Sequence, residues 1–448
     1  MGEMQMNPER IRELKTEDGK YPDEARIASE LIKGSQIYSH NGKSYTPDGE
    51  LSIGEFRNAV ANLLIQIGFK TGIARKTDAI IELIKMLSNV DYIPVEEDEI
   101  PVQNGTVYIA KDGTHSYGEE KHLSPYRLKC SYDPEAKEIT HFQNWLDDLL
   151  TSEDQICFQE IMGYLLLPST RAQKAFFLLG TGGEGKSIWG TILAAMFGDG
   201  FTPTKIYELE ENRFTIATIE NKVIAYDDDM NHDKLKKTDN FKTIVSAKIP
   251  IQGERKGRDK FEFLPYARIC ACGNFALSSL YDTSDGFFRR LLPIRVKNRS
   301  AGRRDVSDYE RTIFPELDAV FMWSLEGLRR LIENDYKFSV SDRSNELLSD
   351  IREESNSIIR FMEAELIFEK GAKVTSDELY SAYSLFCNKH GDVPRGRKSV
   401  PQYFKDREEL LNIRYAKRVR GDKRGFVGMR LKSGRFDLDS ILGKGDAG

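Results

Sequence analysis

The sequence predicts an α/β fold whose central sheet is built around one glycine-rich loop. Residues 180–187 read GTGGEGKS, which fits the phosphate-binding pattern G-x-x-x-x-G-K-[ST]. The apolar run 175–179 before the loop predicts a buried strand, and the apolar spacing over 188–197 predicts a helix after it. Two later apolar runs, 222–230 and 266–273, predict further strands, and polar residues stand at their ends.

A nucleotide site is expected at this loop because its composition suits phosphate. Glycines let backbone N–H groups close around phosphates with no Cβ in the way, and the following helix directs its positive end at them. Lys186 would reach the β- and γ-phosphates of ATP, and the Ser187 hydroxyl would ligate Mg²⁺. A glycine-rich surface turn, the alternative, leaves the Lys-Ser pair without a role. The residues expected to bind the nucleotide are Gly180, Thr181, Gly182, Gly183, Glu184, Gly185, Lys186 and Ser187.

Three acids, Asp227, Asp228 and Asp229, stand at the end of a predicted strand. In a Walker B arrangement one acid holds Mg²⁺ through its waters and the next polarises the attacking water. We expect Asp227 to hold the metal with Ser187 and Asp228 to be the base, with Asp229 as the alternative base. A solvated acidic loop is the competing interpretation. Asn274 ends the next strand along the chain, where its amide would contact the γ-phosphate or its water.

Length and composition narrow the class of protein. A chain of 448 residues is too long for one core and should form about three domains. The chain has neither an apolar run of about 18 residues nor a basic start followed by an apolar stretch, so we expect a cytoplasmic protein without membrane association. A net charge of −6 means that any nucleic acid must bind local basic patches. The five scattered cysteines lack a zinc-site spacing and are expected to be buried thiols.

The first domain is expected to span residues 1–140 and to be mainly helical. Helical spacing of apolar residues runs over 52–87, and an Asn-Gly pair at 104–105 between apolar stretches predicts a hairpin. A helical collar, 141–172, follows directly before the strand of the loop. Residues 1–50 are polar and rich in turn residues, and they indicate little about function.

A hairpin with a basic tip is predicted over 249–263, where apolar and polar residues alternate on both sides of a basic stretch. Further along, Arg289 and Arg290 precede one more strand. An arginine at this place either forms an ordinary salt bridge or reaches the phosphates bound by a neighbouring subunit. The basic residues of the hairpin are Arg255, Lys256, Arg258 and Lys260.

The core is expected to span 173–338 and to close with an amphipathic helix over 315–334. The acidic, serine-rich stretch after it predicts a linker, 339–360. A basic module, 361–436, follows the linker, and residues 437–448 are expected to be a flexible tail.

The basic module has the element order of a winged helix. Thr375 and Glu378 form a capping box that opens one helix, a second helix follows Ser399, and strands over 413–419 and 426–431 form the wing. Lysines and arginines greatly outnumber acids in this part of the module. Such a patch is typical of a surface that binds the phosphate backbone of a nucleic acid, and a merely solvated basic face is the alternative.

These features in this order and spacing resemble the superfamily III helicases of viruses, phages and plasmids. The similarity is greatest to the C-terminal helicase half of phage and plasmid primase-helicases and of the poxvirus primase-helicase. It extends from about residue 25 to the basic module and is strongest over 160–296. The stretches that carry it, besides the loop, the acids, the hairpin, Asn274 and Arg290, are 123–125, 132–136, 163–168, 241–246 and 284–290.

The resemblance implies an AAA+-like core, a hexameric ring with ATP hydrolysis at subunit interfaces, and translocation on single-stranded DNA, typically 3′ to 5′. Residues 1–140 would then be the domain associated with such primase-helicases. The roles implied by position are phosphate and Mg²⁺ binding for Lys186 and Ser187, Walker B acids for Asp227 and Asp228, and a sensor for Asn274.

Two further roles follow from the same resemblance. Lys256 stands where the family presents a DNA-gripping lysine, with Arg255, Arg258 and Lys260 beside it, and Arg290 rather than Arg289 stands at the arginine finger. The sequence departs from the family in carrying three acids after the strand and in lacking a primase half. We therefore expect a stand-alone helicase with a separate primase or other replication protein as partner.

Three functions fit the sequence. The first is a replicative DNA helicase of a phage, plasmid or other mobile element, acting on single-stranded or forked DNA. The second is an initiator or regulatory ATPase that assembles on an origin without processive unwinding. The third is an ATPase that remodels proteins, which would have no need of the basic hairpin and wing.

Overall fold

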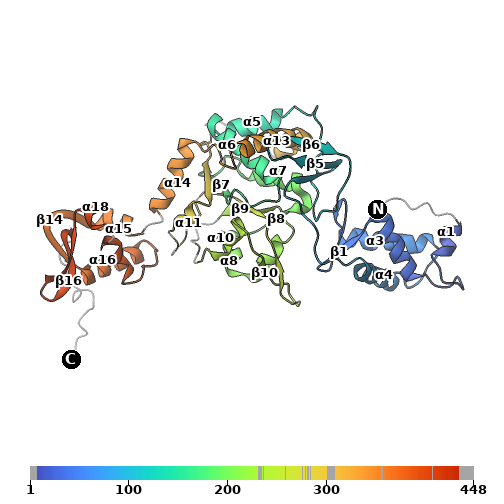
Figure 1. Cartoon of the computed structure of the whole chain (residues 1–448), viewed down its shortest axis with the longest axis horizontal. Helices are drawn as coiled ribbons and strands as arrows, with labels where there is room; N and C mark the ends of the chain where they lie inside the picture. Colours follow the sequence, from blue (N-terminus) through green and yellow to red (C-terminus); the bar gives the residue numbers. More distant parts are fainter. Residues whose placement is uncertain are drawn as a thin grey trace, which may run out of the picture. The chain divides into compact units, whose positions relative to one another are not determined.

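The computed structural model describes residues 8–230, 235, 237–257, 259–274, 276–277, 279, 282, 284–299, 308–354, 357–405 and 407–432. The chain divides into two compact units, each treated by itself below (Figure 1). The first consists of Met1–Asn231, Asn240–Phe275 and Leu292–Ser344, and the second of His232–Asp239, Ala276–Leu291 and Asn345–Gly448.

The centre of the first unit is a five-stranded sheet in the order β13-β7-β12-β9-β8. The pairings of β7 with β12, β12 with β9, and β9 with β8 are parallel. All residues of β7 and β12 are buried, which is the burial expected of parallel strands that are covered on both faces. The predicted α/β class and its three strands are confirmed. The strands are β7 (Ala175–Leu179), β8 (Phe201–Pro203), β9 (Ile224–Met230), β12 (Arg268–Gly273) and β13 (Leu291–Arg295).

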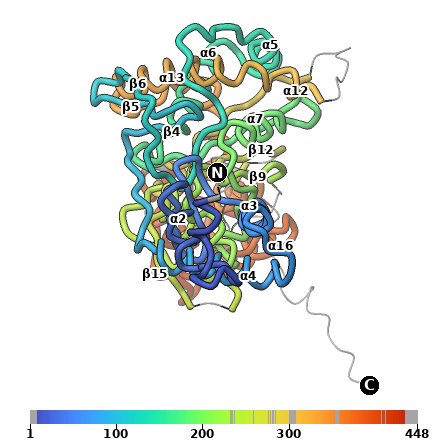
Figure 2. Tube along the Cα trace, turned by 90° about the vertical axis from the view of Figure 1, so that its right-hand side faces the viewer, coloured from blue at the N-terminus to red at the C-terminus, as the bar shows by residue number. Residues whose placement is uncertain are grey.

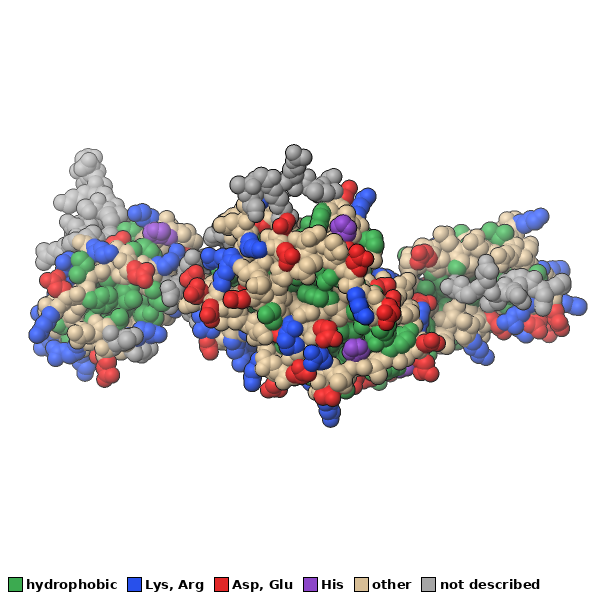
Figure 3. Space-filling view, turned by 90° about the horizontal axis from the view of Figure 1, so that it is seen from above, with side chains coloured by type: hydrophobic (Ala, Val, Ile, Leu, Met, Phe, Trp, Pro, Cys, Tyr) green, Lys and Arg blue, Asp and Glu red, His purple; other side chains and the backbone are tan. Residues whose placement is uncertain are grey.

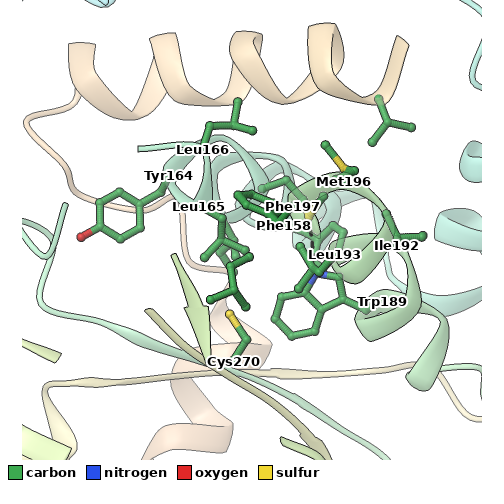
Figure 4. Packing of buried hydrophobic residues seen from close by; sticks show 14 of the residues in the cluster. Phe158, Tyr164, Leu165, Leu166, Trp189, Ile192, Leu193, Met196, Phe197 and Cys270 are labelled. Atoms are coloured by element: carbon green, nitrogen blue, oxygen red, sulfur yellow. Dashed lines mark hydrogen bonds between the residues drawn. The ribbon is translucent and has the colours of Figure 1, made fainter. Parts of the chain in front are cut away.

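Helix α7 (Ser187–Phe197) begins at the end of the glycine-rich loop and lies between the sheet and a second helical layer (Figure 2). Gly190 sets its distance from the sheet, because a Cβ there would come within 2.2 Å of the Tyr226 ring on β9. Figure 4 shows Trp189, Leu193 and their neighbours on α7 packed between α6 and Cys270 of β12. The helix thus connects the loop rigidly to the core.

The second layer pairs α6 (Ser152–Leu165) with α13 (Leu317–Glu333) through two glycines. A Cβ on Gly163 would lie 2.3 Å from the backbone nitrogen of Leu328. A Cβ on Gly327 would lie 2.1 Å from the carbonyl oxygen of Gln159. The two backbones therefore approach more closely than any other residue type allows.

The predicted collar consists of α5 (Thr140–Leu149) and α6. A new helix begins at Ser152 because the Thr151 side chain accepts the N–H of Asp154. The predicted amphipathic helix over 315–334 is confirmed as α13, which is buried along one side against α6.

The N-terminal part is helical, as expected, but residues before 50 are more regular than their polar composition indicates. Asp23 caps α2, whose Ile27, Ala28 and Leu31 are buried. The hairpin at the Asn-Gly pair is confirmed by β4 and β5, which pair antiparallel. The elements are α1 (Pro8–Glu13), α2 (Glu24–Ser35), β1 (Tyr38–His40), β2 (Lys43–Thr46), β3 (Gly49–Glu50), α3 (Ile53–Gln66), α4 (Ile73–Leu87), β4 (Glu99–Val102), β5 (Gly105–Ile109) and β6 (His115–Gly118).

Short elements complete the first unit. The predicted basic hairpin is confirmed, although its antiparallel strands have only three residues each. All five cysteines are free and buried, as expected. The elements are α8 (Ile206–Glu211), α9 (Arg213–Ile216), α10 (Asp239–Val245), β10 (Ile251–Gly253), β11 (Phe261–Phe263) and α12 (Glu310–Ile313), together with three 3-10 turns at Gly198–Gly200, Ala217–Ile219 and Phe314–Glu316.

The stretch predicted as a linker, 339–360, contains helices, and the boundary between the two units falls within it. Ser341 accepts the N–H of Ser344 and so caps α14 (Asp342–Glu354). Leu347 and Ile351, four residues apart, are buried on that helix. The dominance of charged and serine residues concealed this narrow apolar stripe.

The second unit combines helices with a three-stranded antiparallel sheet in the order β14-β16-β15. The predicted capping box at Thr375 and Glu378 is present at the start of α16. Strand β14 was not predicted from the sequence. The turn between β15 and β16 is shorter than predicted, because the strands extend to Arg420 and from Lys423. The elements are α11 (Asp285–Phe288), α15 (Ser357–Glu365), β14 (Leu366–Thr375), α16 (Ser376–Lys389), α17 (Ser399–Lys405), α18 (Glu408–Leu411), β15 (Arg414–Arg420) and β16 (Lys423–Leu431).

The contact between α6 and α13 predicts that Gly163→Ala is strongly destabilising. The added methyl group would meet backbone atoms, which cannot move aside as a flexible side chain does, so we expect a loss of about 3 kcal/mol in the free energy of unfolding. Gly34→Ala is the matched control, because Gly34 lies on α2 with no atom within 4 Å of its Cβ position. Denaturant unfolding should show Gly34→Ala within about 1 kcal/mol of the parent. Equal stability of the two variants would contradict the close packing.

Candidate functional site

Three neighbouring strands of the sheet end at one level, and polar residues follow each of them. Gly273 of β12 pairs with Leu179 of β7 on one side and with Met230 of β9 on the other. A pocket of about 610 Å³ opens at this edge. It is lined by Asp148, Gly182, Gly183, Glu184, Gly185, Lys186, Ser187, Ile188, Asp228, Asp229, Gly273, Asn274 and Tyr309.

The glycines of the loop are needed for its shape. Gly182, Gly183 and Gly185 have φ angles of 114°, 78° and 92°, a region that residues with a Cβ rarely adopt. Gly180 is required for space, since a Cβ there would lie 2.5 Å from Cγ2 of Val296 and 2.8 Å from Oε1 of Glu184. The loop therefore closes around the position of the Glu184 carboxylate.

Glu184 and Lys186 form a buried ion pair inside the loop. The Lys186 Nζ donates to Oε2 of Glu184 at 2.7 Å, and the two residues are 8% and 2% exposed. The carboxylate also accepts the backbone N–H of Thr181 at 2.5 Å, the Thr181 hydroxyl at 2.9 Å and the backbone N–H of Gly182 at 2.9 and 3.0 Å. One carboxylate thus collects donors from both ends of the loop.

Burial by itself would raise the pKa of Glu184, but hydrogen bonds from Lys186 and Thr181 outweigh it and hold the pKa at about 2. The carboxylate is therefore ionised across the neutral range. Its folded pKa lies below the unfolded one, so its contribution to stability is complete at neutral pH and is lost as the pH falls toward 2.

Side chains from three other elements anchor the loop from behind. The Trp145 indole on α5 donates to the carbonyl oxygen of Gly185 at 3.0 Å. Burial raises the pKa of the Cys272 thiol to about 12, so it stays protonated and donates to the carbonyl oxygen of Lys186 at 3.4 Å. The Tyr226 hydroxyl donates to this thiol at 3.0 Å. The roles of Trp145, Cys272 and Tyr226 were not predicted from the sequence, because their apolar character indicated only core packing.

Asn274 lies where the sequence placed it, beside the acids and the loop. Its side chain is exposed to the pocket, and its Oδ1 is 3.4 Å from Nζ of Lys186. The structure thus brings Lys186, Ser187 and Asn274 together at one pocket, with Asp228 on the neighbouring strand.

The three acids of β9 have different surroundings. Asp227 is 2% exposed, and its oxygens accept Nζ of Lys205 at 2.7 Å and the N–H of Ile206 at 3.1 Å. Asp228 and Asp229 are exposed and line the pocket. The structure therefore does not place Asp227 at the pocket beside Ser187, where we expected the metal ligand.

An irregular pairing separates Asp227 from the two acids that follow it. Asp227 pairs with Ala271, whereas Met230 already pairs with Gly273, so β9 has one residue more than β12 between these two pairs. The extra residue changes the facing of the last acids. The sequence also gave no signal for Lys205, which lies on the segment after β8.

The residues at the pocket suit a hard cation such as Mg²⁺. Asp228, Asp229 and the exposed Ser187 hydroxyl supply oxygen donors, which Mg²⁺ prefers, and Mg²⁺ usually keeps several waters beside few protein ligands. Over the described ranges, no group of three or more His, Cys, Asp and Glu side chains is placed to hold a metal.

Among the described residues that line the pocket, carboxylates outnumber cations. Asp148, Glu184, Asp228 and Asp229 are acidic, and Lys186 is basic. One further cation is close, because a Cβ on Gly183 would lie 3.4 Å from the Nη1 atom of Arg299. A phosphate group entering this pocket would therefore require additional positive charge.

The basic hairpin presents only part of its predicted tip. Lys256 and Lys260 are exposed, whereas Arg258 lies outside the described residues. Arg255 is bound internally: its guanidinium forms an ion pair with the buried Glu220 and lies 4.4 Å from the centre of the Phe261 ring.

Glu220 also accepts a hydrogen bond from Asn41 at 2.7 Å. The expectation that Arg255 contacts DNA is therefore not supported by its surroundings. Its contacts fix the turn of the hairpin instead.

Arg290 belongs to the second unit, and its guanidinium donates to the carbonyl oxygen of Gly286. Burial lowers the pKa of Arg290, although not enough to neutralise an arginine at ordinary pH. Arg289 is exposed. The finger role of Arg290 stays a prediction.

The basic residues of the C-terminal module divide into two groups. Arg397, Arg420 and Arg430 form ion pairs with acids of the same module. Others on the hairpin of β15 and β16 are exposed, namely Arg414, Lys417, Lys423 and Arg424. Basic and acidic side chains are interspersed on the face shown in Figure 3. The DNA-binding role of this module stays a prediction.

Comparison with known sequences gives one match, to a family profile over part of the chain. A profile of a family of unknown function (DUF5906) matches residues 178–290, which include the loop from Gly180 onward, the acids, the hairpin and Asn274. No curated protein sequence matches the chain. Within the described residues, no helix is long and apolar enough to cross a membrane.

Two kinds of solved structure are similar to this chain at low sequence identity. One apo structure of the NrS-1 C-terminal region is 12% identical, covers 91% of this chain and 99% of its own, and has a TM-score of 0.46. The A form of that region is 11% identical over 90% and 99%, also with a TM-score of 0.46. JCV helicase is 14% identical, covers 49% of this chain and 62% of its own, and has a TM-score of 0.28. A helicase is thus among the structural neighbours of this mixed α/β chain.

Proposed function

We propose that the chain is an ATP-dependent DNA helicase of a phage, plasmid or other mobile element, with an AAA+-like core of superfamily III. The observation that carries this proposal is the convergence of Lys186, Asn274, Asp228 and Asp229 on one pocket at the carboxyl ends of three adjacent strands. Ligands bind at this edge of open α/β sheets. A glycine-rich loop running into a helix supplies the N–H groups that phosphates require.

Each pocket residue then has a chemical role. Lys186 neutralises the phosphates of ATP, and the Asn274 amide, 3.4 Å from it, orients the terminal phosphate or the attacking water. Asp228 and Asp229 replace Asp227 and Asp228 as the working pair of acids, one near the metal and one near the water. Mg²⁺, held with Ser187, would neutralise charge that develops on the phosphates.

Assembly into a ring, most simply a hexamer, would complete the site. Among the described lining residues carboxylates outnumber cations, so we expect the transition state to need positive charge from elsewhere. A neighbouring subunit can supply it, and Arg290 is our candidate for that arginine. This arrangement would make hydrolysis depend on assembly.

Contacts with DNA are assigned to exposed basic side chains. Lys256 and Lys260 at the hairpin would bind the phosphates of the translocated single strand, since a flexible lysine holds a phosphate without regard to base. The exposed cations of β15 and β16 would make the C-terminal module a winged-helix contact to the duplex of a fork. We propose that a separate primase acts together with this helicase.

The alternative function is an initiator or regulatory ATPase. Binding to an origin sequence without unwinding of a fork would favour that alternative.

The central test of the proposal is Lys186→Ala. Removing the ammonium group deletes the charge aimed at the phosphates, so we expect ATP hydrolysis to fall by at least about 100-fold. Lys137→Ala is the control, because its side chain is 76% exposed and is not among the residues that line the pocket. A steady-state ATPase assay with single-stranded DNA should separate the two. Equal turnover would exclude this loop as the working site.

The assignment of the acids gives a second test. Asp228→Asn and Asp229→Asn should each lower single-turnover ATP hydrolysis by about 100-fold while nucleotide still binds. Asp227→Asn should keep most hydrolysis and lose about 1 kcal/mol of unfolding free energy, since it weakens the half-exposed pair with Lys205. The reverse pattern, with hydrolysis lost only in Asp227→Asn, would support Asp227 as the metal ligand, as expected from the sequence.

The hairpin gives a third test. Lys256→Ala should retain basal ATPase activity yet lose most unwinding of a fork and most stimulation by single-stranded DNA, because an exposed phosphate contact is removed. Lys111→Ala, an exposed lysine in the β5–β6 turn, is the control. Arg255→Ala should instead destabilise the protein, because it leaves the buried Glu220 without its cation. Parental unwinding by Lys256→Ala would show that another residue grips the strand.

A further inference from the structure

We propose that Glu184 is a built-in substitute for phosphate, and that nucleotide binds only after this carboxylate leaves the loop. The inference rests on the proposed nucleotide site and adds a device that regulates its occupancy. The motif G-x-x-x-x-G-K-[ST] leaves the residue at position 184 unspecified, so nothing in the motif requires an acid there.

The donors that hold Glu184 are the kind that bind phosphate. Its Oε2 atom accepts the Lys186 ammonium group at 2.7 Å, the same cation that is expected to meet the β- and γ-phosphates. Its Oε1 atom accepts the N–H of Thr181 at 2.5 Å, the hydroxyl of Thr181 at 2.9 Å and the N–H of Gly182 at 2.9 Å. A carboxylate that receives backbone N–H groups and one ammonium group mimics a bound phosphate oxygen pair.

Glu184 and a phosphate cannot both occupy this position. Lys186 is 8% exposed and Glu184 is 2% exposed, so little space or water separates them from the loop wall. The wall is close on the opposite side too, since a Cβ on Gly180 would lie within 2.8 Å of the Glu184 carboxylate. An incoming phosphate would place a second anion on the same ammonium group, which like-charge repulsion opposes.

The pocket gives the carboxylate somewhere to go. Glu184 lines the open space of about 610 Å³ together with Ser187 and Asn274, so rotation of its side chain would carry the carboxylate out of the loop and into solvent. Binding therefore includes a conformational step before phosphate reaches Lys186. The apparent affinity for nucleotide is then the intrinsic affinity multiplied by the fraction of molecules in which Glu184 has left the loop.

Titration with ADP that carries a fluorescent N-methylanthraniloyl group tests this device. Glu184→Ala should bind at least about tenfold more tightly than the parent, because no carboxylate competes, and Glu184→Gln should fall between them, since it keeps the shape and loses the charge. Glu135→Gln removes an exposed carboxylate that is 88% accessible and should bind like the parent. Thermal unfolding of each variant establishes that the loop change leaves the fold intact.

Association kinetics give an independent measurement on the same samples. In the parent, the observed rate should reach a plateau as nucleotide concentration rises, because departure of Glu184 limits it; in Glu184→Ala the rate should rise linearly. Equal or weaker binding by both Glu184 variants, with a plateau unchanged, would overturn the inference and show that Glu184 shapes the loop for phosphate. Absence of binding by the parent and by all variants would overturn the nucleotide site as well, so the two failures are distinguishable.

Discussion

The parallel register of β7, β12 and β9 is the constraint on which the site depends. Gly273 pairs with the last residue of β7 and with the last residue of β9, so three segments far apart in the sequence end side by side. A slip of one residue in any of these strands would exchange the side chains of its two faces and disrupt the packing on both. The burial of both sheet faces therefore keeps the loop, the amide and the acids at one edge, and α7, which Gly190 seats on Tyr226, fixes the loop to that edge.

Within the described residues of one chain, carboxylates outnumber cations at the site. Lys186 is paired with Glu184, and Asp228 and Asp229 line the same pocket. Such a lining tolerates a polyphosphate only with a metal ion and with further cations. A neighbouring subunit that supplies an arginine, as proposed above, would offset this excess of negative charge. The Arg255 pair with Glu220 ties the turn of the basic hairpin to the core.

Local patterns predicted the loop, its strand and helix, the acid strand, the hairpin and α13, because glycine spacing and apolar periodicity are properties of adjacent residues. The facing of Asp228 and Asp229 could not be predicted in this way, since it depends on one extra residue of β9 relative to β12, and neither could the pairing of Asp227 with Lys205. The position of Glu184 inside the loop was equally hidden, because the motif leaves this residue unspecified. The helical form of 342–354 was not predicted, because the apolar residues Leu347 and Ile351 form only a narrow buried stripe on α14.

The claim that residues 180–187 bind nucleotide phosphate is tested most directly by an experimental structure of the full chain with ADP and Mg²⁺. The account predicts the β-phosphate within hydrogen-bond distance of Nζ of Lys186, with the Glu184 carboxylate turned away from the loop. A nucleotide bound elsewhere, or a phosphate beside a Glu184–Lys186 pair that keeps its 2.7 Å contact, would contradict it.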